Sequence, residues 1–198
     1  MQKKQQLLYD MTESHDGYFM VKEAVDAGIS RPTISSYLKR HQFMKISPGL
    51  YKKEETWDDP LFALQQQYPE TIYTGSTALY QYGLLDREPA QITVTVKKGY
   101  NALRLHQQGI RTYYIDSALF RLGSSEQQTF YGHFVKMYDM DRAFCDLIRH
   151  KKDYEIQDFQ TGIKSYFRSR EKNLNRLMEY AKKLRIEKKI QLYAEVLL

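Results

Sequence analysis

The sequence predicts an α+β protein in two parts, a small N-terminal domain over residues 1–56 and a larger mixed α/β domain over residues 57–198 that ends in helices. A chain of 198 residues exceeds the roughly 100 to 150 residues of a typical single domain. In the first part, apolar residues at helical spacing precede a tight hairpin. In the second part, strand-like segments come first and helical patterns follow, an order that favours an α+β fold.

The first thirty residues predict two helices separated by a sharp turn. One helix is expected over residues 2–12, where leucine and methionine recur at helical spacing, and Asp16-Gly17 should end it. Residues 18–20 can add a short extended segment. A second helix of two turns should stop at Gly28, because glycine adopts the left-handed conformation that ends helices at little cost.

A third helix is expected to begin after Ser30, a residue type favoured at helix N-caps. Pro32 falls in its first turn, where the missing backbone N–H removes no helical hydrogen bond. Ile34, Leu38 and His41 recur on one face, and we expect all three to point into the core. The opposite face of this helix is then polar and exposed.

The segment after the third helix predicts a β-hairpin. Residues 43–46 and 50–52 are strand-like, and they flank Ser47-Pro48-Gly49. Proline followed by glycine suits the two central positions of a type II turn. Two helices with a tight turn between them, followed by a two-stranded wing, are the arrangement of a winged helix-turn-helix DNA-binding domain.

The distribution of charge supports the same interpretation. The 30 Lys and Arg residues exceed the 24 Asp and Glu residues by six, a mild excess. Residues 1–30 hold three basic and five acidic residues, whereas residues 31–53 hold six basic residues and no acidic one. The acid-free run coincides with the two elements that would enter the grooves of DNA.

The candidate DNA-binding residues follow from this placement. Side chains of the third helix would meet base edges, and side chains of the hairpin would meet phosphates or a minor groove. The helix contributes Arg31, Thr33, Ser35, Ser36, Lys39 and Arg40, and the hairpin contributes Lys45, Lys52 and Lys53. The alternative is an interaction adaptor that keeps a solvated basic face and does not bind DNA.

The remaining residues predict the elements of the second domain. Asp58-Asp59-Pro60 should open a helix, and Gly75-Ser76 should cap another. Strands are expected at residues 71–74, 92–96, 111–115 and 130–138, and helices at residues 141–150, 154–167, 174–184 and 186–197.

A nucleotidyltransferase is the rival interpretation from a different class of protein. Gly75-Ser76 followed by Asp86 and Glu88 matches the glycine-serine and paired-acid spacing of these enzymes, whose carboxylates hold Mg²⁺ on nucleotide phosphates. The context disfavours it, because Arg87 separates the two acids and Pro89 follows them, where a strand would be required. We therefore expect no enzymatic activity, although Asp86 and Glu88 remain the alternative.

Other reactive residue types give no stronger signal. Asp139 and Asp141 lie where a strand should meet a helix, so capping explains them better than metal binding, and Asp146 adds too few acids for a two-metal centre. The five histidines lack metal-ligand spacing. The single cysteine, Cys145, excludes an intrachain disulfide and is expected to be buried. No metal or cofactor is therefore expected.

The chain shows neither a signal peptide nor an apolar run of membrane-spanning length, so we expect a cytoplasmic protein without membrane contact. A second concentration of positive charge lies in residues 164–198, where ten basic residues face four acidic ones. Such a run is typical of a solvated face, and contact with nucleic acid or an acidic partner is the alternative.

Four groups of residues, taken in order, resemble the AbiEi antitoxins of the AbiE abortive-infection system. They are residues 27–31 (Ala-Gly-Ile-Ser-Arg) with 48–51 (Pro-Gly-Leu-Tyr), residues 74–79 (Thr-Gly-Ser-Thr-Ala-Leu) with 83–86 (Gly-Leu-Leu-Asp), the strand pattern at 92–96, and residues 140–148 (Met-Asp-Arg-Ala-Phe-Cys-Asp-Leu-Ile). The likeness extends over residues 21–198.

The resemblance implies a type IV toxin-antitoxin operon that acts in phage defence. The antitoxin of such a system represses its own promoter through inverted repeats bound by the winged helix. Its C-terminal domain counteracts a nucleotidyltransferase-like toxin without forming a stable complex. We accordingly expect double-stranded DNA and this toxin as partners, and a monomer in solution with two or more copies on DNA.

Overall fold

The computed structural model describes residues 2–197, which form two compact units. The first unit runs up to Pro69 and also includes Gln128–His133. The second comprises Glu70–Gln127 and the residues from Phe134 onward. We expected the first domain to end at residue 56. The compact unit is longer, because the helix after that point packs against the N-terminal hairpin.

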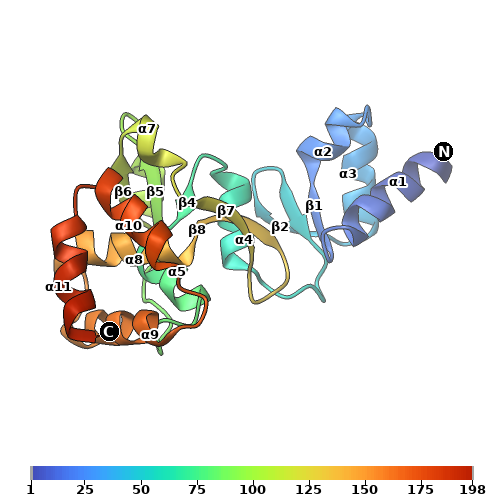
Figure 1. The fold of residues 1–198 in the computed structure, drawn as a ribbon. Coiled ribbons are helices and arrows are strands. Elements are labelled where there is room, and N and C mark those ends of the chain that lie inside the picture. The colour runs from blue at the N-terminus through green and yellow to red at the C-terminus, as the bar shows by residue number, and fades with distance from the viewer. Residues whose placement is uncertain (1, 198) are drawn as a thin grey trace. The chain divides into compact units, whose positions relative to one another are not determined.

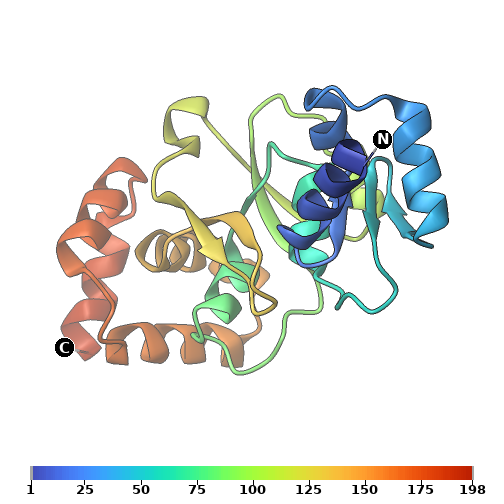
Figure 2. The ribbon, with the colours of Figure 1, turned by 90° about the vertical axis from the view of Figure 1, so that its right-hand side faces the viewer.

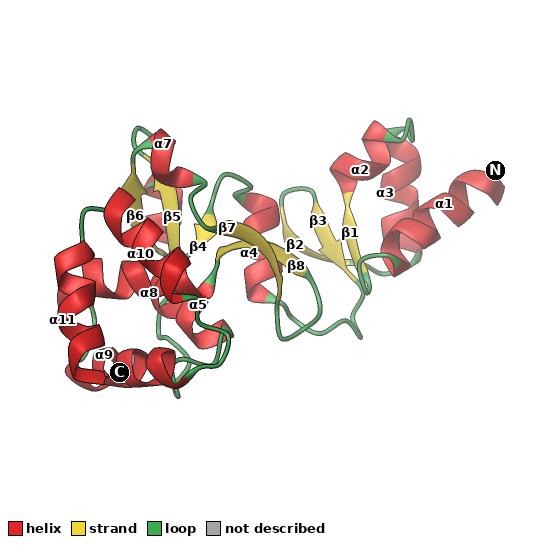
Figure 3. Ribbon diagram, in the orientation of Figure 1, coloured by secondary structure: helices red, strands yellow, loops and turns green. Residues whose placement is uncertain are grey.

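The first unit contains four helices and a small antiparallel sheet of order β1-β3-β2 (Figures 1 and 3). The expected order of helices and hairpin strands is present, and residues 18–20 add the third strand. Its elements are α1 (Gln2–Glu13), β1 (Tyr18–Met20), α2 (Val21–Asp26), α3 (Arg31–Arg40), β2 (Met44–Ser47), β3 (Leu50–Lys52) and α4 (Pro60–Gln67).

The hairpin turns where the Pro-Gly pair predicts. Ser47 pairs with Leu50, so Pro48 and Gly49 form a two-residue connection. Gly49 has φ +84°, the left-handed conformation that the second central position of a type II turn requires. The register shifts between Lys45 and Ser47, which is a β-bulge on the β2 strand.

The core of the first unit joins its three N-terminal helices to β1. Helix α1 packs on β1 and α3, and α2 packs on α3. The buried side chains of this core are Leu8, Phe19, Ala24, Ile29, Ile34, Tyr37 and Leu38. Burial of apolar surface, at about 25 cal/mol per Å², is therefore what holds α3 in place.

The second unit is built on a five-stranded sheet of order β6-β5-β4-β8-β7. Strand β5 pairs antiparallel with β4 and parallel with β6, and β4 pairs parallel with β8, so the sheet is mixed. The elements up to the last strand are β4 (Ile72–Tyr73), α5 (Gly75–Gln81), β5 (Thr93–Lys97), α6 (Leu103–Gln107), β6 (Arg111–Ile115), α7 (Ser117–Phe120), β7 (Ser124–Gln128) and β8 (Phe134–Tyr138).

Only helices follow the sheet. They are α8 (Met140–Arg149), a 3₁₀ turn η1 (Lys151–Asp153), α9 (Ile156–Arg168), α10 (Leu174–Lys183) and α11 (Glu187–Leu197). Residues 140–148 of α8 are all buried, because α5, α9, α10 and α11 pack against this helix (Figure 2). The α+β class expected for the chain is confirmed.

Several short elements of the second unit were not predicted, among them α6, α7 and β7. Helices α6 and α7 are five and four residues long, too short to show a helical period. Strand β7 has the sequence Ser-Ser-Glu-Gln-Gln, without a β-branched or aromatic residue, and it lies at the edge of the sheet. The strand expected at residues 130–138 is shorter, because β8 begins at Phe134.

No helix within residues 2–197 has both the length and the apolar content that crossing a membrane requires.

Gly123→Ala should destabilise the second unit more than Gly109→Ala. Both glycines have left-handed backbones, with φ +73° and φ +74°. A Cβ at Gly123 would lie 2.7 Å from the Cβ of Arg142, whereas a Cβ at Gly109 would meet nothing within 4 Å. We expect about 1–2 kcal/mol of lost stability from the backbone at each site, and roughly 1–3 kcal/mol more at Gly123 from overpacking.

Urea unfolding followed by circular dichroism measures both variants. Equal losses for the two substitutions would show that Arg142 moves aside without cost.

Candidate nucleic-acid interface

Helix α3 has a buried apolar face. One residue of this face differs from the three that the sequence predicts. Ile34 and Leu38 are buried as expected. His41, which we expected to be inside, is exposed, because α3 ends at Arg40 and His41 is its C-cap residue. Tyr37 takes the inward position, where its ring lies 5.8 Å from that of Phe19.

The opposite face of α3 is polar and exposed. Arg31, Ser35 and Lys39 follow one another at intervals of four residues and therefore form one row along the helix. Ser36 and Arg40 form a second exposed row beside it. The sequence had placed all five residues on the solvent face, and the structure places them there.

Thr33 lies in the first turn of α3 and is less exposed than the other predicted contact residues of this helix. It is half-buried, and its hydroxyl lies 2.8 Å from the hydroxyl of Ser30. Ser30 is the N-cap residue, as expected, but its hydroxyl does not accept a backbone N–H in the described structure. The two hydroxyls instead form one hydrogen bond with each other at the helix N-terminus, and the half-buried Thr33 is less accessible to a ligand than the exposed Ser35 and Ser36.

A concave surface of about 410 Å³ lies between α3 and the hairpin. The first polar row of α3 borders it, and apolar side chains form the rest. The lining residues are Arg31, Ser35 and Lys39 with Val21, Ile34, Leu38, Phe43 and Tyr51. An exposed helix row and an adjacent hairpin thus share one surface, which combines cationic groups with hydroxyls.

Lys45 and Lys52, both predicted to contact phosphates, lie in different surroundings. Lys45 is exposed on β2. Lys52 is buried, and its ammonium donates to the backbone oxygen of Thr56 at 2.7 Å and lies 2.7 Å from a carboxylate oxygen of Asp58. Side chains alternate along a strand, so Lys52 shares the inward face of Leu50. Lys52 is therefore removed from the candidate interface.

Lys53 is partly engaged by α1. Its ammonium donates a hydrogen bond of 2.7 Å to Glu13 and lies 5.6 Å above the ring of Tyr9. The hydrogen bond to Glu13 raises the pKa of Lys53. This charge is therefore already balanced within the protein.

Four of the predicted cations remain available. Within residues 2–197, no ion pair or side-chain hydrogen bond of the structure involves the charged groups of Arg31, Lys39, Arg40 and Lys45. The candidate interface is therefore narrower than the sequence predicted. It consists of these four cations with the exposed hydroxyls of Ser35 and Ser36.

The paired acids that a nucleotidyltransferase would need lie on an exposed loop. Asp86 and Glu88 are both exposed and neither is in a strand. Arg87 between them pairs with Glu155 at 3.1 Å and Asp158 at 2.9 Å, and these hydrogen bonds raise its pKa. No group of three or more histidine, cysteine or carboxylate side chains among the described residues could hold a metal ion.

The acids of α8 have structural partners. Asp139 caps the helix as predicted, accepting the backbone N–H of Arg142 at 2.8 Å, and burial raises its pKa. Asp141 is fully buried, and accepts a 2.6 Å hydrogen bond from Tyr166 and another from Arg176. It therefore joins three helices, which the capping interpretation did not foresee.

Asp146 and Cys145, further along α8, are also buried. Asp146 accepts hydrogen bonds from Thr74 and Arg149, both at 2.9 Å. The buried thiol expected at Cys145 is confirmed, and burial raises its pKa, which keeps it protonated and unreactive.

The first unit contains a buried polar cluster that the sequence did not predict. The Asp59 carboxylate caps α4, and it contacts Thr129 at 2.6 Å and the ring of His133 at 2.9 Å. The His133 ring also stacks on Phe62, with 4.3 Å between ring centroids. The Asp59-Pro60 pair predicted the cap, but no sequence pattern links Asp59 to residues some seventy positions later.

No protein-family model matches the chain, and no curated protein matches it significantly. Among solved structures, the chain is similar to one described as the RV2827C protein from Mycobacterium tuberculosis, with a TM-score of 0.58 and 12% sequence identity. The match covers 89% of this chain and 70% of that chain. At this identity the likeness shows a shared fold and carries no information on activity.

Lys52→Ala should destabilise the first unit, whereas Lys45→Ala should leave its stability nearly unchanged. A lost hydrogen bond to a buried charged group costs roughly 1.5–3 kcal/mol, while exposed substitutions stay within about 0.5 kcal/mol. Urea unfolding of the two variants measures the difference. Comparable stability of both would place Lys52 on the surface and return it to the candidate interface.

Proposed function

We propose that the first unit is a winged helix-turn-helix domain that binds double-stranded DNA. Its elements follow the order α1-β1-α2-α3-β2-β3, in which α3 is the recognition helix and the β2–β3 hairpin is the wing. The single observation that carries the proposal is the exposed face of α3, where Arg31, Lys39 and Arg40 have no internal ion-pair partner among the described residues.

The side chains of α3 and those of the wing suit different contacts. Arginine and lysine recognise guanine through its O6 and N7 atoms, and serine hydroxyls can donate to or accept from base edges. Lys45 on the wing would contact a phosphate, which positions the domain without reading sequence. Lys52 and Lys53 would contribute little, because their ammonium groups already have carboxylate partners.

We further propose that the protein is the antitoxin and transcriptional autorepressor of a type IV toxin-antitoxin operon. What supports this role is the ordered set of motifs that resemble AbiEi antitoxins, together with an exposed cationic helix suited to inverted repeats in a promoter. In this proposal the second unit counteracts a nucleotidyltransferase-like toxin, without a stable complex between the two proteins.

Lys39→Ala and Arg40→Ala should weaken binding to the DNA upstream of the protein's own gene. If the side chain reads a base, the loss is roughly 1–3 kcal/mol and sequence preference relaxes at one position. Fluorescence anisotropy with labelled duplexes measures both effects. Lys188→Ala is the matched control, because it removes one exposed positive charge from α11 and should leave affinity unchanged.

The salt dependence of the same binding provides a second check. Each phosphate contact contributes about −0.9 to the slope of log K against log salt, so the slope is roughly −3.6 if all four available cations lie against phosphates and becomes shallower by about 0.9 for each one that contacts only a base. An affinity independent of salt, or equal losses in Lys39→Ala and Lys188→Ala, would refute the proposed interface. The non-DNA-binding adaptor would then be the better interpretation.

Co-expression tests the antitoxin role. The protein should restore the growth of cells that express a nucleotidyltransferase-like toxin encoded beside it, and size-exclusion chromatography should show the two proteins eluting separately. Lys39→Ala should still restore growth, because antitoxicity is assigned to the second unit. Failure of the wild-type protein to restore growth would exclude this role. Nucleotide incorporation with Mg²⁺ that Asp86→Ala abolishes would instead favour the nucleotidyltransferase.

A further inference from the structure

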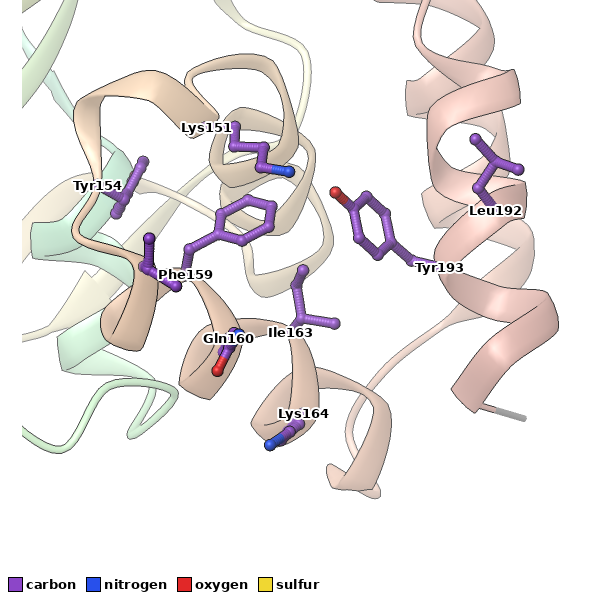
Figure 4. A pocket seen from close by; sticks show the side chains of 9 residues that line it. Lys151, Tyr154, Phe159, Gln160, Ile163, Lys164, Leu192 and Tyr193 are labelled. Carbon is purple, nitrogen blue, oxygen red and sulfur yellow. The ribbon is translucent and has the colours of Figure 1, made fainter.

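The second unit contains an apolar hollow of about 760 Å³ between α9 and α11 (Figure 4). Its lining residues are Lys151, Tyr154, Ile156, Phe159, Gln160, Ile163, Lys164, Leu192 and Tyr193. A second hollow of about 510 Å³ adjoins it and shares Lys151, Leu192 and Tyr193. We call the two hollows together the α9–α11 groove.

The floor of the groove is apolar. Phe159 and Ile163 are buried beneath it, and the ring of Tyr193 meets that of Phe159 edge-on at 5.9 Å (Figure 4). At its edges Ile156 is 78% exposed and Leu192 is 65% exposed, which are unfavourable positions for large aliphatic side chains in water. The groove thus offers apolar contacts that the chain itself leaves open.

The rim of the groove is cationic. Lys151, Lys152, Lys164 and Lys189 are all exposed, and none of their ammonium groups forms an ion pair within the described residues. The Nζ atom of Lys151 lies 5.1 Å from the centroid of the Phe159 ring, where the apolar floor meets the cationic rim.

Acidic groups that could neutralise this rim are engaged elsewhere. Glu155, the N-cap residue of α9, and Asp158 within this helix pair with Arg87, which does not line the groove. Asp153 is the sole carboxylate among the described lining residues, and it accepts a 2.8 Å hydrogen bond from Tyr113. Four lysines against this one lining carboxylate make the net charge around the apolar floor positive.

We propose that the α9–α11 groove binds an acidic amphipathic helix of a partner protein. Such a helix would place apolar side chains, spaced three and four residues apart, on the floor, and its flanking carboxylates would meet the four lysines. A nucleic acid would satisfy the lysines but would leave Ile156 and Leu192 without aliphatic partners. The site lies in the second unit and does not depend on DNA binding.

A designed peptide tests the proposal directly. The probe is a fluorescein-labelled helix of eighteen residues with leucines along one face and glutamates on both flanks, and its counterpart carries lysines in place of the glutamates. We expect the acidic peptide to bind the full-length protein at least tenfold more tightly than the basic one. Leu192→Glu should weaken binding of the acidic peptide at least tenfold. Lys164→Glu should weaken the acidic peptide and strengthen the basic one.

Leu103→Glu is the matched control, since Leu103 is 59% exposed on α6 and does not line the groove. It should leave both affinities unchanged, and none of these surface substitutions should alter promoter binding. Equal affinity for the two peptides, or an acidic peptide that binds Leu192→Glu and wild type alike, would overturn the proposal. So would a single-stranded oligonucleotide that displaces the peptide and still binds Leu192→Glu, because the groove would then be a nucleic-acid site.

Discussion

The second unit depends on how α8 accommodates buried charge. Asp141 and Arg142 of this helix are fully buried, and Asp146 is 2% exposed. Burying an isolated charge is costly, so each must find a partner. Asp141 is satisfied by Tyr166 of α9 and by Arg176 of α10, and Asp146 is satisfied by Thr74 at the start of α5. The helices around α8 are thus fixed by its charges as well as by apolar contact.

Arg142 is held by a mixture of contacts. One of its Nη atoms donates to the backbone oxygen of Leu122 at 2.7 Å, and its guanidinium lies 4.0 Å from the centre of the Tyr138 ring. Its Nε is 3.3 Å from Asp146, close enough for attraction but too poorly aligned for a hydrogen bond, so it is unsatisfied within the described structure. The Arg142 side chain is thus enclosed on several sides, and Gly123 lies so close to it that an added Cβ would be 2.7 Å from the Cβ of Arg142.

Local pattern was sufficient for much of the first unit. Ser30 and Pro32 located α3, and Pro48-Gly49 located the hairpin, because these residues act through their own backbone conformation. His41 was placed wrongly, since the helical period says nothing about where a helix stops. Lys52 was placed wrongly because its charge was given more weight than its alternation with Leu50, and its burial depends on acceptors at Thr56 and Asp58.

Contacts between residues far apart in the sequence could not be predicted from local sequence patterns. The bonds from Asp59 to Thr129 and His133 span some seventy residues, and the charge network of α8 joins segments separated by 25 to 72 residues. The only sequence feature that relates to the α9–α11 groove is the excess of basic residues at 164–198, which includes Lys164 and Lys189 of the rim. Its apolar floor comes from two helices whose pairing the sequence did not specify.

The segment Gln128–His133 belongs to the first unit although the residues on both sides of it belong to the second. The backbone therefore passes from one unit to the other three times, after Pro69, after Gln127 and after His133. Neither unit corresponds to one uninterrupted stretch of gene. A fragment that ended at Pro69 would leave Asp59 without Thr129 and His133, which both lie in the Gln128–His133 segment, so the first unit is completed only by residues from far along the chain.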